Sequence, residues 1–347
     1  MIYQLGRYIE SESELEDLLT TPSPSLISDM TRQPDGDLVV LGAGGKMGPS
    51  LAILAQRAAS AAGLKSQVYA VSRFSNQKAR DLLDQAGVIT VAFDLLQTPD
   101  LRQLPDASQV VFMAGQKFGT ADEPPLTWAL NTYLPARVAE RYADSKLVAF
   151  STGNVYPLTP AASGGSVESD PLMPIGEYAQ SCLGRERILT YFSNHKGTQI
   201  TILRLNYAID LRYGVLLDLA QKVDQGIPID LQMGNVNLIW QGDANEMALR
   251  TFSLCTSPPQ VLNLTGPETI SIRLLAHRLG QIFNQEPIFI NTEGETSFLN
   301  NASRCHQIFS YPRVPLGQMI DWVAHWVKIG GPTLDKPTHF EVRTGTF

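Results

Sequence analysis

The sequence predicts an α/β protein, with a doubly wound parallel sheet followed by a smaller C-terminal α/β lobe. Two observations support this fold class. Between residues 38 and 205, short apolar runs alternate with longer segments whose apolar residues recur at helical spacing. Repeated strand–helix units of this kind build parallel sheets that are covered by helices on both faces. The first apolar run also ends in glycines, as expected for a buried strand that leads into a tight turn.

The individual elements can be followed along the chain. Apolar runs typical of buried strands occupy residues 38–41, 67–71, 88–92, 109–113, 147–150 and 199–205. Helical spacing predicts helices over residues 50–62, 76–86, 127–143 and 178–195. Beyond residue 206 the rhythm is irregular, with short strands at 237–240 and 261–264 and helices at 243–254, 271–283 and 316–328. This change of rhythm predicts a separate, smaller lobe.

Length, charge and cysteine content limit the class of protein. The chain has 347 residues, of which 44% are hydrophobic, enough for one large or two modest domains. Its 27 basic and 34 acidic residues give a net charge of −7, so we expect no nucleic-acid partner. No apolar stretch reaches the roughly 20 residues of a membrane span, and the N-terminus does not resemble a signal peptide. Three cysteines, far apart in the sequence, fit a reducing compartment. We therefore expect a cytoplasmic protein without a membrane partner.

The strongest local signal is a glycine-rich loop between the first strand and the first helix. Gly42, Gly45 and Gly48 follow one another at intervals of three, with Lys46 and Met47 between the last two. Glycines here permit a tight turn, close approach of a pyrophosphate and close packing of helix on strand. The helix N-terminus would then bind the phosphates. A P-loop is excluded because it needs glycine where Val40 stands and a hydroxyl residue where Met47 stands.

The end of the second strand indicates which dinucleotide is bound. An acidic residue there would bind the ribose of NAD, whereas a basic residue would accommodate the additional phosphate of NADP. The chain has Ser72 and Arg73 at this point and no carboxylate before Asp81. An arginine side chain presents several donors to a phosphate, although Arg73 could also be a solvated surface residue. We predict NADP as the cofactor, with NAD as the alternative.

These motifs divide the chain into four parts. We expect an N-terminal extension (1–36), a dinucleotide-binding domain (37–205), a substrate-binding lobe (206–330) and a C-terminal tail (331–347). The extension contains a short amphipathic helix at residues 11–19 that is broken by prolines. It is expected to be a surface appendage; the alternative is an arm that covers a partner subunit or the active site.

The order of further motifs resembles the extended short-chain dehydrogenase/reductases, also called the NAD-dependent epimerase/dehydratase family. The resemblance covers residues 38–328 and implies a Rossmann sheet. By this resemblance, additional cofactor-binding residues are Asp94 and Leu95 after the third strand, Ala114 and Gly115 after the fourth, Asn131 on the following helix, and Cys182. The segment from Phe150 to Tyr156 resembles the family's serine-rich strand end and implies Thr152 as a catalytic residue, with Asn154 at the substrate. The Arg204-Leu205-Asn206 segment implies Asn206 as a second substrate-binding residue.

The catalytic motif departs from the family at one position. Tyr178 matches the catalytic tyrosine, but the lysine expected four residues later is Cys182. Residues four apart share a helix face, and the lysine's charge favours the phenolate. An unperturbed tyrosine titrates near pH ~10, so without a cation Tyr178 is a poor base. As a neutral phenol it can still donate a proton, as carbonyl reduction requires.

Three hypotheses follow from the missing lysine. In the first, a cation is supplied from elsewhere, for which Lys117 and Arg204 are candidates. In the second, Tyr178 and Thr152 act only as hydrogen-bond donors to a carbonyl oxygen. In the third, the protein has lost hydride chemistry and senses NADP(H) or regulates a partner. Cys182 as a nucleophile is disfavoured, because no histidine is near it in sequence and a cysteine on a helix is usually a packing residue.

The substrate side also departs from the family. Nucleotide-sugar members carry arginines that clamp the diphosphate, but residues 236–243 contain none. Arg204, Arg212 and Arg304 could substitute, although structural roles are more common for such arginines. The histidines show no metal spacing, so we predict no metal. The prediction is an NAD(P)-dependent oxidoreductase or epimerase that acts on a hydroxyl or carbonyl of a small polar metabolite, such as a sugar or sugar acid. The resemblance also implies a homodimer that pairs through helices 127–143 and 178–195.

Overall fold

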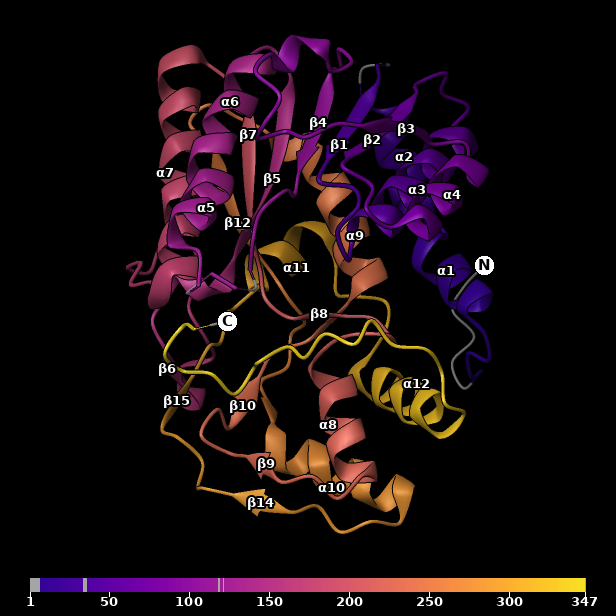
Figure 1. The fold of residues 1–347 in the computed structure, drawn as a ribbon, viewed down its shortest axis with the longest axis vertical. Helices are drawn as coiled ribbons and strands as arrows, with labels where there is room; N and C mark the ends of the chain where they lie inside the picture. Colours follow the sequence, from indigo (N-terminus) through magenta and orange to yellow (C-terminus); the bar gives the residue numbers. More distant parts are fainter. Residues whose placement is uncertain (1–6, 34–35, 118, 121, 347) are drawn as a thin grey trace.

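The computed structural model describes residues 7–33, 36–117, 119–120 and 122–346. Its centre is a seven-stranded sheet with the order β12-β7-β5-β4-β1-β2-β3, in which neighbouring strands are parallel (Figure 1). The strands are β1 (Leu38–Leu41), β2 (Val68–Ser72), β3 (Ile89–Ala92), β4 (Gln109–Phe112), β5 (Lys146–Thr152), β7 (Ile200–Leu205) and β12 (Gln260–Leu264). The predicted fold class and the predicted strands are therefore confirmed.

Helices cover both faces of the sheet (Figure 1). One face packs against α6 (Leu134–Arg141) and α7 (Gly176–Lys196) through a cluster that includes Val138 and Leu189. The other packs against α3 (Gly48–Ala61), α4 (Gln77–Gln85), α9 (Gln241–Arg250) and α11 (Ser303–Phe309). Because both faces are covered, β1 and β4 are buried along their whole length, which explains their continuous apolar sequences.

The long helix predicted over residues 127–143 is in fact three shorter segments. They are α5 (Pro124–Trp128), a π-helical turn η2 (Ala129–Tyr133) and α6. The hydrophobic spacing of residues 127–143 did not show this interruption, which covers only five residues. Single π-turns occur frequently at functional sites, and this one holds Asn131 at the carboxyl end of the sheet.

The prediction that residues 1–36 form a surface appendage was wrong for the part that the structure describes. Residues after position 10 form α1 (Glu12–Thr20) and α2 (Pro24–Thr31), which pack against α3 and α9. Leu15, Leu19 and Leu26 are fully buried. Burying three leucines contributes about 1.5–3 kcal/mol each, which is why the extension joins the core.

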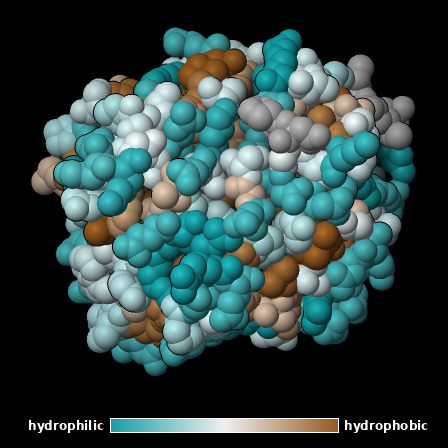
Figure 2. Space-filling view, turned by 90° about the horizontal axis from the view of Figure 1, so that it is seen from above, coloured by the Kyte–Doolittle hydropathy of each residue, from teal (hydrophilic) through white to brown (hydrophobic). Residues whose placement is uncertain are grey.

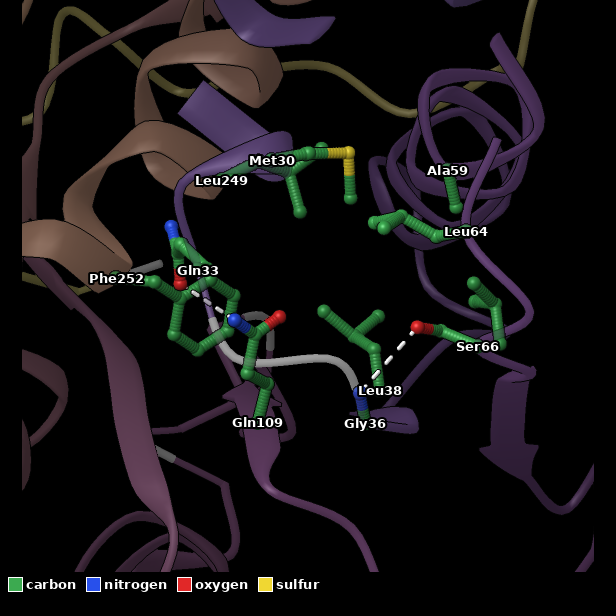
Figure 3. Close-up of a pocket in the computed structure, with 11 residues that line it drawn as sticks. Met30, Gln33, Gly36, Leu38, Ala59, Leu64, Ser66, Gln109, Leu249 and Phe252 are labelled. Carbon is green, nitrogen blue, oxygen red and sulfur yellow. Dashed lines mark hydrogen bonds between the residues drawn. The ribbon is translucent and has the colours of Figure 1, made fainter. Parts of the chain in front are cut away.

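Figure 3 shows how α2 closes the amino end of the sheet. Met30 and Gln33 lie opposite Leu38 and Gln109, around a cavity of about 20 Å³. The Gln109 side chain donates to Gln33 at 2.5 Å. A cavity of this volume holds about one water molecule, so it is not a substrate site.

A smaller lobe lies below the sheet in Figure 1. It has its own apolar core, built mainly by α8 (Val215–Asp224), α10 (Ile272–Phe283) and α12 (Leu316–Lys328). Short strands complete it: β8 (Ala208–Ile209), β9 (Ile229–Asp230), β10 (Asn235–Val236), β11 (Ile239–Trp240), β13 (Ile270–Ser271) and β14 (Phe289–Ile290). The expected lobe 206–330 is not continuous, however, because α9, β12 and α11 return to the large sheet.

The short strand β15 (Thr296–Ser297) pairs with β6 (Thr159–Pro160) and links the two parts of the molecule. The C-terminal tail beyond α12, yellow in Figure 1, then crosses between the lobe and the sheet toward the start of α7. Phe340 in this tail is buried in the lobe's core. The tail is therefore an integral part of the lobe.

The end of the molecule that lies uppermost in Figure 1 is shown in Figure 2. Hydrophilic residues dominate this face, and hydrophobic ones form small separate groups. No helix in the described part of the chain is long and apolar enough to cross a membrane. Within the same residues, no His, Cys, Asp and Glu side chains form a cluster that could hold a metal ion. In sheets of this topology ligands bind at the carboxyl ends of the strands, which here face the lobe.

Candidate active site

The glycine-rich loop has the geometry that its sequence predicts. Gly42 has a φ of +91°, and a Cβ on it would lie 2.6 Å from the backbone nitrogen of Ala114. A Cβ on Gly48 would lie 2.4 Å from the carbonyl oxygen of Ala43. Around Gly45, by contrast, the nearest atom to a Cβ would be 3.4 Å away. Two glycines thus permit tight packing, and the third leaves open backbone at the mouth of the loop.

The N-terminus of α3 is free of a side-chain cap. Met47 occupies the N-cap position and makes no capping hydrogen bond. Lys46 points elsewhere: its Nζ donates to the carbonyl of Ala208 at 2.7 Å and lies 4.1 Å from the ring centroid of Tyr213. Burial lowers the pKa of Lys46 to about 7. The helix N–H groups and the helix dipole therefore remain available to an anion, while Lys46 joins the loop to the smaller lobe.

The end of β2 places Ser72 beside the loop and Arg73 at the surface. A Cβ on Gly44 would lie 2.4 Å from Oγ of Ser72, so the hydroxyl adjoins the loop backbone. Arg73 is exposed and makes no hydrogen bond or ion pair with any residue that the structure describes. Its guanidinium is therefore available at the position where the two dinucleotides differ.

The two residues after β3 lie in a turn. Asp94 accepts hydrogen bonds from the backbone nitrogens of Leu96 and Gln97, each at 2.9 Å through Oδ1. Leu95 is buried, and its carbonyl accepts a bond from Arg137. Oδ1 of Asp94 is thus used by the turn, which orients the carboxylate at the carboxyl end of the sheet.

Asn131, which the resemblance implies as a cofactor-binding residue, is hydrogen-bonded within the protein. It is buried, and its amide is bonded on both sides by protein groups. Its Nδ2 donates to the carbonyl of Gln116 and to Ser181, and its Oδ1 accepts from the Gln116 nitrogen and from Arg185. Asn131 therefore fixes the strand end that bears Ala114 and Gly115 onto α7.

Arg185 is a site residue that the sequence analysis missed. Its guanidinium is buried, donating to the carbonyl of Phe150 at 2.6 Å and to Asn131. A Cβ on Gly115 would lie 2.5 Å from its Nη2. The spacing of seven residues from Tyr178 along a helix could have indicated it, because residues three, four and seven apart share a face.

Thr152 and Tyr178 come together as predicted. Thr152 ends β5, Tyr178 lies in the first turns of α7, and their side chains are hydrogen-bonded. Burial raises the pKa of Tyr178 well above its usual value; neighbouring Cys182 acts in the same direction, and Thr152 and Arg185 oppose it. Tyr178 is therefore a neutral phenol at neutral pH and a proton donor rather than a base.

Cys182 lies one helical turn beyond Tyr178 and is fully buried. It packs with Val155 and Tyr156, and its side chain is hydrogen-bonded to Tyr178. Burial raises the pKa of the Cys182 thiol, which makes a thiolate less available. This position thus has no positive charge and no activated nucleophile.

The two proposed substitutes for the missing lysine are placed very differently. Arg204 is bound to Glu186 with an N–O distance of 2.8 Å, both side chains being 5% exposed, and it also donates to Tyr156. Lys117 instead interacts electrostatically with Cys182 and with Asp218 of α8. Burial lowers the pKa of Lys117 to about 8 against the attraction of both. Of the two, only Lys117 acts electrostatically on Cys182, whereas the cation that acts on Tyr178 is Arg185.

The two predicted substrate residues lie at the ends of β5 and β7. Asn154 is buried, and its backbone nitrogen donates to Oγ1 of Thr152 at 3.2 Å. Asn206 is also buried, and its Nδ2 donates to the carbonyl of Phe298 at 3.2 Å. Both asparagines are thus at the carboxyl edge of the sheet, where the smaller lobe meets it.

The C-terminal tail covers this side of the site. Thr338 donates twice to Asp218 of α8, from its backbone nitrogen at 2.9 Å and its hydroxyl at 2.6 Å. Glu341 forms an ion pair with Lys222. Near the end of the tail, a Cβ on Gly345 would overlap the carbonyl of Ile175, three residues before Tyr178. The tail therefore bridges from α8 to the start of α7.

A sequence model described as the NAD dependent epimerase/dehydratase family matches residues 38–209. That segment includes the glycine-rich loop, Thr152 and Tyr178. Residues 38–209 belong to this family. Comparison with curated proteins gives no significant match.

Solved structures of epimerases share the fold. The UDP-glucose 4-epimerase of Thermus thermophilus, in complex with NAD, has 18% sequence identity and a TM-score of 0.68, with 84% of this chain and 99% of that chain covered. The Bacillus cereus UDP-glucuronic acid 4-epimerase, in complex with UDP-glucuronic acid and NAD, has the same identity, coverage and TM-score. MoeE5, in complex with UDP-glucose and NAD, has 17% identity over 85% of this chain and 99% of its own, also at a TM-score of 0.68.

Proposed function

We propose that this epimerase/dehydratase-family protein is an NADP(H)-dependent oxidoreductase or epimerase acting on a hydroxyl or carbonyl of a small polar metabolite. The observation that supports this most directly is the hydrogen-bonded pair of Thr152 and Tyr178 at the carboxyl end of β5. Two hydroxyl groups at this position can hold one carbonyl oxygen between them. The chemical step would then use a hydride supplied by the bound nicotinamide.

The residues of the loop fit a dinucleotide. Gly42 and Gly48 occupy positions where a Cβ would overlap backbone atoms, and Gly45 leaves the loop mouth open. The uncapped N-terminus of α3 offers N–H groups to a pyrophosphate. The relatives described above were solved with NAD, which supports a nicotinamide dinucleotide for this chain as well. The free guanidinium of Arg73 favours NADP over NAD.

Within the site, Tyr178 would donate its proton to the substrate oxygen. Its raised pKa keeps the phenol protonated, which suits reduction of a carbonyl better than oxidation of an alcohol. Thr152 would hold the same oxygen and orient the phenol. This division of roles predicts that reduction is the faster direction at neutral pH.

Lys117 would replace the family's missing lysine. It belongs to the loop after β4 rather than to α7, and its charge interacts electrostatically with Cys182. This charge would stabilise the phenolate that forms as Tyr178 gives up its proton. The buried guanidinium of Arg185 is the cation that acts directly on Tyr178, whose pKa it lowers against the effect of burial.

The substrate is proposed to lack a nucleotide diphosphate. The arginines that could clamp one are bound elsewhere: Arg204 to Glu186, and Arg212 to Asp210 and Glu16. Arg304 is exposed and donates to Gln260. A diphosphate is held by charge-assisted hydrogen bonds from arginine side chains. Arg204 and Arg212 already make such bonds to carboxylates of the protein. A sugar or sugar acid without a nucleotide also agrees with a tail that crosses the substrate side of the site.

A homodimer is proposed on the α5–α7 side of the molecule. Trp128, Tyr133 and Tyr191 lie on these helices and are between 39% and 58% exposed. Aromatic side chains exposed together are typical of protein–protein interfaces. Size-exclusion chromatography with light scattering tests this, and a Tyr133→Lys, Tyr191→Lys variant should be monomeric.

The experiment that tests the function is hydride transfer from NADPH to a panel of small aldehydes and ketones, with Tyr178→Phe as the control. Turnover by the wild-type protein and its loss in Tyr178→Phe would support the proposal. The alternative is a protein that binds NADP(H) and senses or regulates, which the cysteine at position 182 favours. NADPH binding without turnover in either protein would replace the enzyme by this alternative.

A further inference from the structure

One buried side chain at the carboxyl edge of the sheet has no hydrogen-bond partner. Asn300 is 2% exposed, and neither its Oδ1 nor its Nδ2 is bonded to any described residue. Leaving both ends of a buried amide unsatisfied is unfavourable, and native proteins rarely do so without a ligand or water nearby. The amide is therefore a candidate for recognising a bound molecule.

The position of this amide relates it to the catalytic pair. A Cβ on Gly153 would lie 2.5 Å from Nδ2 and 2.6 Å from Oδ1 of Asn300. Gly153 directly follows Thr152, whose side chain is bonded to Tyr178. Any larger residue at position 153 would fill the space that the Asn300 amide occupies. The absent side chain of Gly153 is thus the reason that Asn300 reaches the end of β5.

The backbone around Asn300 is held firmly in this place. Its nitrogen donates to Oδ1 of Asn237 in the smaller lobe at 2.9 Å. Two residues earlier, the carbonyl of Phe298 accepts from Asn206 at the end of β7. One residue later, the carbonyl of Asn301 accepts from Asn263 on β12. Two strands of the large sheet and the lobe therefore fix the segment, so its amide is preorganised rather than mobile.

We propose that Asn300 is a specificity-determining residue that binds a hydroxyl group on the carbon next to the reacting carbonyl. An amide presents a donor and an acceptor, and a hydroxyl is the small group that can both donate and accept. The placement beside Thr152 puts that hydroxyl next to the oxygen held by Thr152 and Tyr178. The substrate class is thus an α-hydroxy carbonyl compound, and its reduction gives a vicinal diol. This inference rests on the proposed function.

A paired substrate test examines this directly. Hydroxyacetone and acetone differ only in the α-hydroxyl, and so do glycolaldehyde and acetaldehyde. The wild-type protein with NADPH is expected to show a kcat/KM at least about 100-fold higher for the hydroxylated member, since a site built to bind a hydroxyl discriminates strongly against its absence. Asn300→Ala should reduce this ratio to about tenfold or less.

Further variants distinguish the loss of the Asn300 amide from a general effect of misfolding on the ratio. Gly153→Ala should lower the same ratio, because its Cβ would displace the Asn300 amide. Asn301→Ala is the matched control. Among the described residues its side chain accepts only from the Ser303 nitrogen, so the ratio should remain that of the wild type. An unchanged ratio in Asn300→Ala would overturn the proposal, and Asn300→Ser is used if the alanine variant does not fold.

A measurement that does not need turnover separates this proposal from the proposed function. The side-chain amide of ¹⁵N-labelled protein at Asn300, assigned by its loss in Asn300→Asp, is followed in the presence of NADP. A shift with hydroxyacetone but not with acetone supports Asn300 even if no turnover is seen, in which case only the proposed function fails. Absence of any shift overturns the role of Asn300. An equal shift with both ketones also overturns it.

Discussion

The replacement of Lys117 by methionine is the most informative perturbation of this site. Methionine has a similar length and no charge. The variant therefore removes the cation that interacts electrostatically with Cys182 and leaves most of the packing. We expect kcat/KM for carbonyl reduction to fall by about 100- to 1,000-fold, the usual effect of removing one preorganised electrostatic group. Lys117→Arg should restore part of the activity because it restores the charge.

The pH dependence of the reductive rate gives a second expected effect of Lys117. Burial lowers the pKa of Lys117 to about 8, while Asp218 and Cys182 act to raise it and the charge of Lys46 lies nearby. The side chain of Lys117 is therefore charged below about pH 8 and neutral above it. With that pKa about nine-tenths of the side chain is charged near pH ~7 and about one-tenth near pH ~9, so the reductive rate should fall about tenfold across this interval.

Two measurements check this reasoning. The first is the pH profile of kcat/KM for the wild type and for Lys117→Met, which should lack the alkaline decrease. The second is the direct titration of ¹³C-methylated lysines by NMR, in which the Lys117 signal is identified by its loss in the variant. A Lys117 pKa near the ordinary value of ~10.4, or an alkaline limb that persists in Lys117→Met, would refute the assignment.

Three further predictions concern the cofactor loop and the core. Arg73→Ala is expected to weaken NADPH binding by about tenfold or more, the loss of one charge-assisted contact, and to leave NADH binding nearly unchanged; equal losses in calorimetry would contradict the preference for NADP. Gly42→Ala should abolish dinucleotide binding, because its Cβ would overlap the backbone of Ala114 at a φ of +91°; normal affinity in a fluorescence titration would disprove this geometry. Glu186→Gln should lower the free energy of unfolding by about 3 kcal/mol because it leaves Arg204 buried without its carboxylate; a urea midpoint equal to that of the wild type would argue against it.

Much of the fold could be predicted because the signals are local. Buried parallel strands require continuous apolar runs, and the loop after β1 requires glycines at particular positions. The same locality explains the correct pairing of Thr152 with Tyr178, since a strand end and a helix start in a Rossmann sheet meet in a regular way.

Other features depended on contacts between distant parts of the chain. The burial of Leu15 and Leu19 in the core of the smaller lobe could not be recognised from a short polar helix, because its apolar face is narrow. Periodicity alone also missed the interruption of the predicted helix 127–143, because the π-helical turn covers only five residues. The return of β12 to the large sheet follows from pairing with β7, which no sequence pattern announces.

The features of the candidate active site also fall into two groups, those that the sequence determines and those that only the tertiary structure decides. Its sequence motifs determined the sheet, the glycine-rich loop, the tyrosine and the position at which a lysine is missing, because each of these is a property of neighbouring residues. Only the tertiary structure decided that Lys117 interacts electrostatically with Cys182, that Arg204 is bound to Glu186, and that Asn300 reaches Gly153 across 147 positions of sequence. The physical reason is that charge and hydrogen bonding act through space. Which charged side chains act on the site therefore depends on the three-dimensional fold, and not only on residues that are neighbours in the sequence.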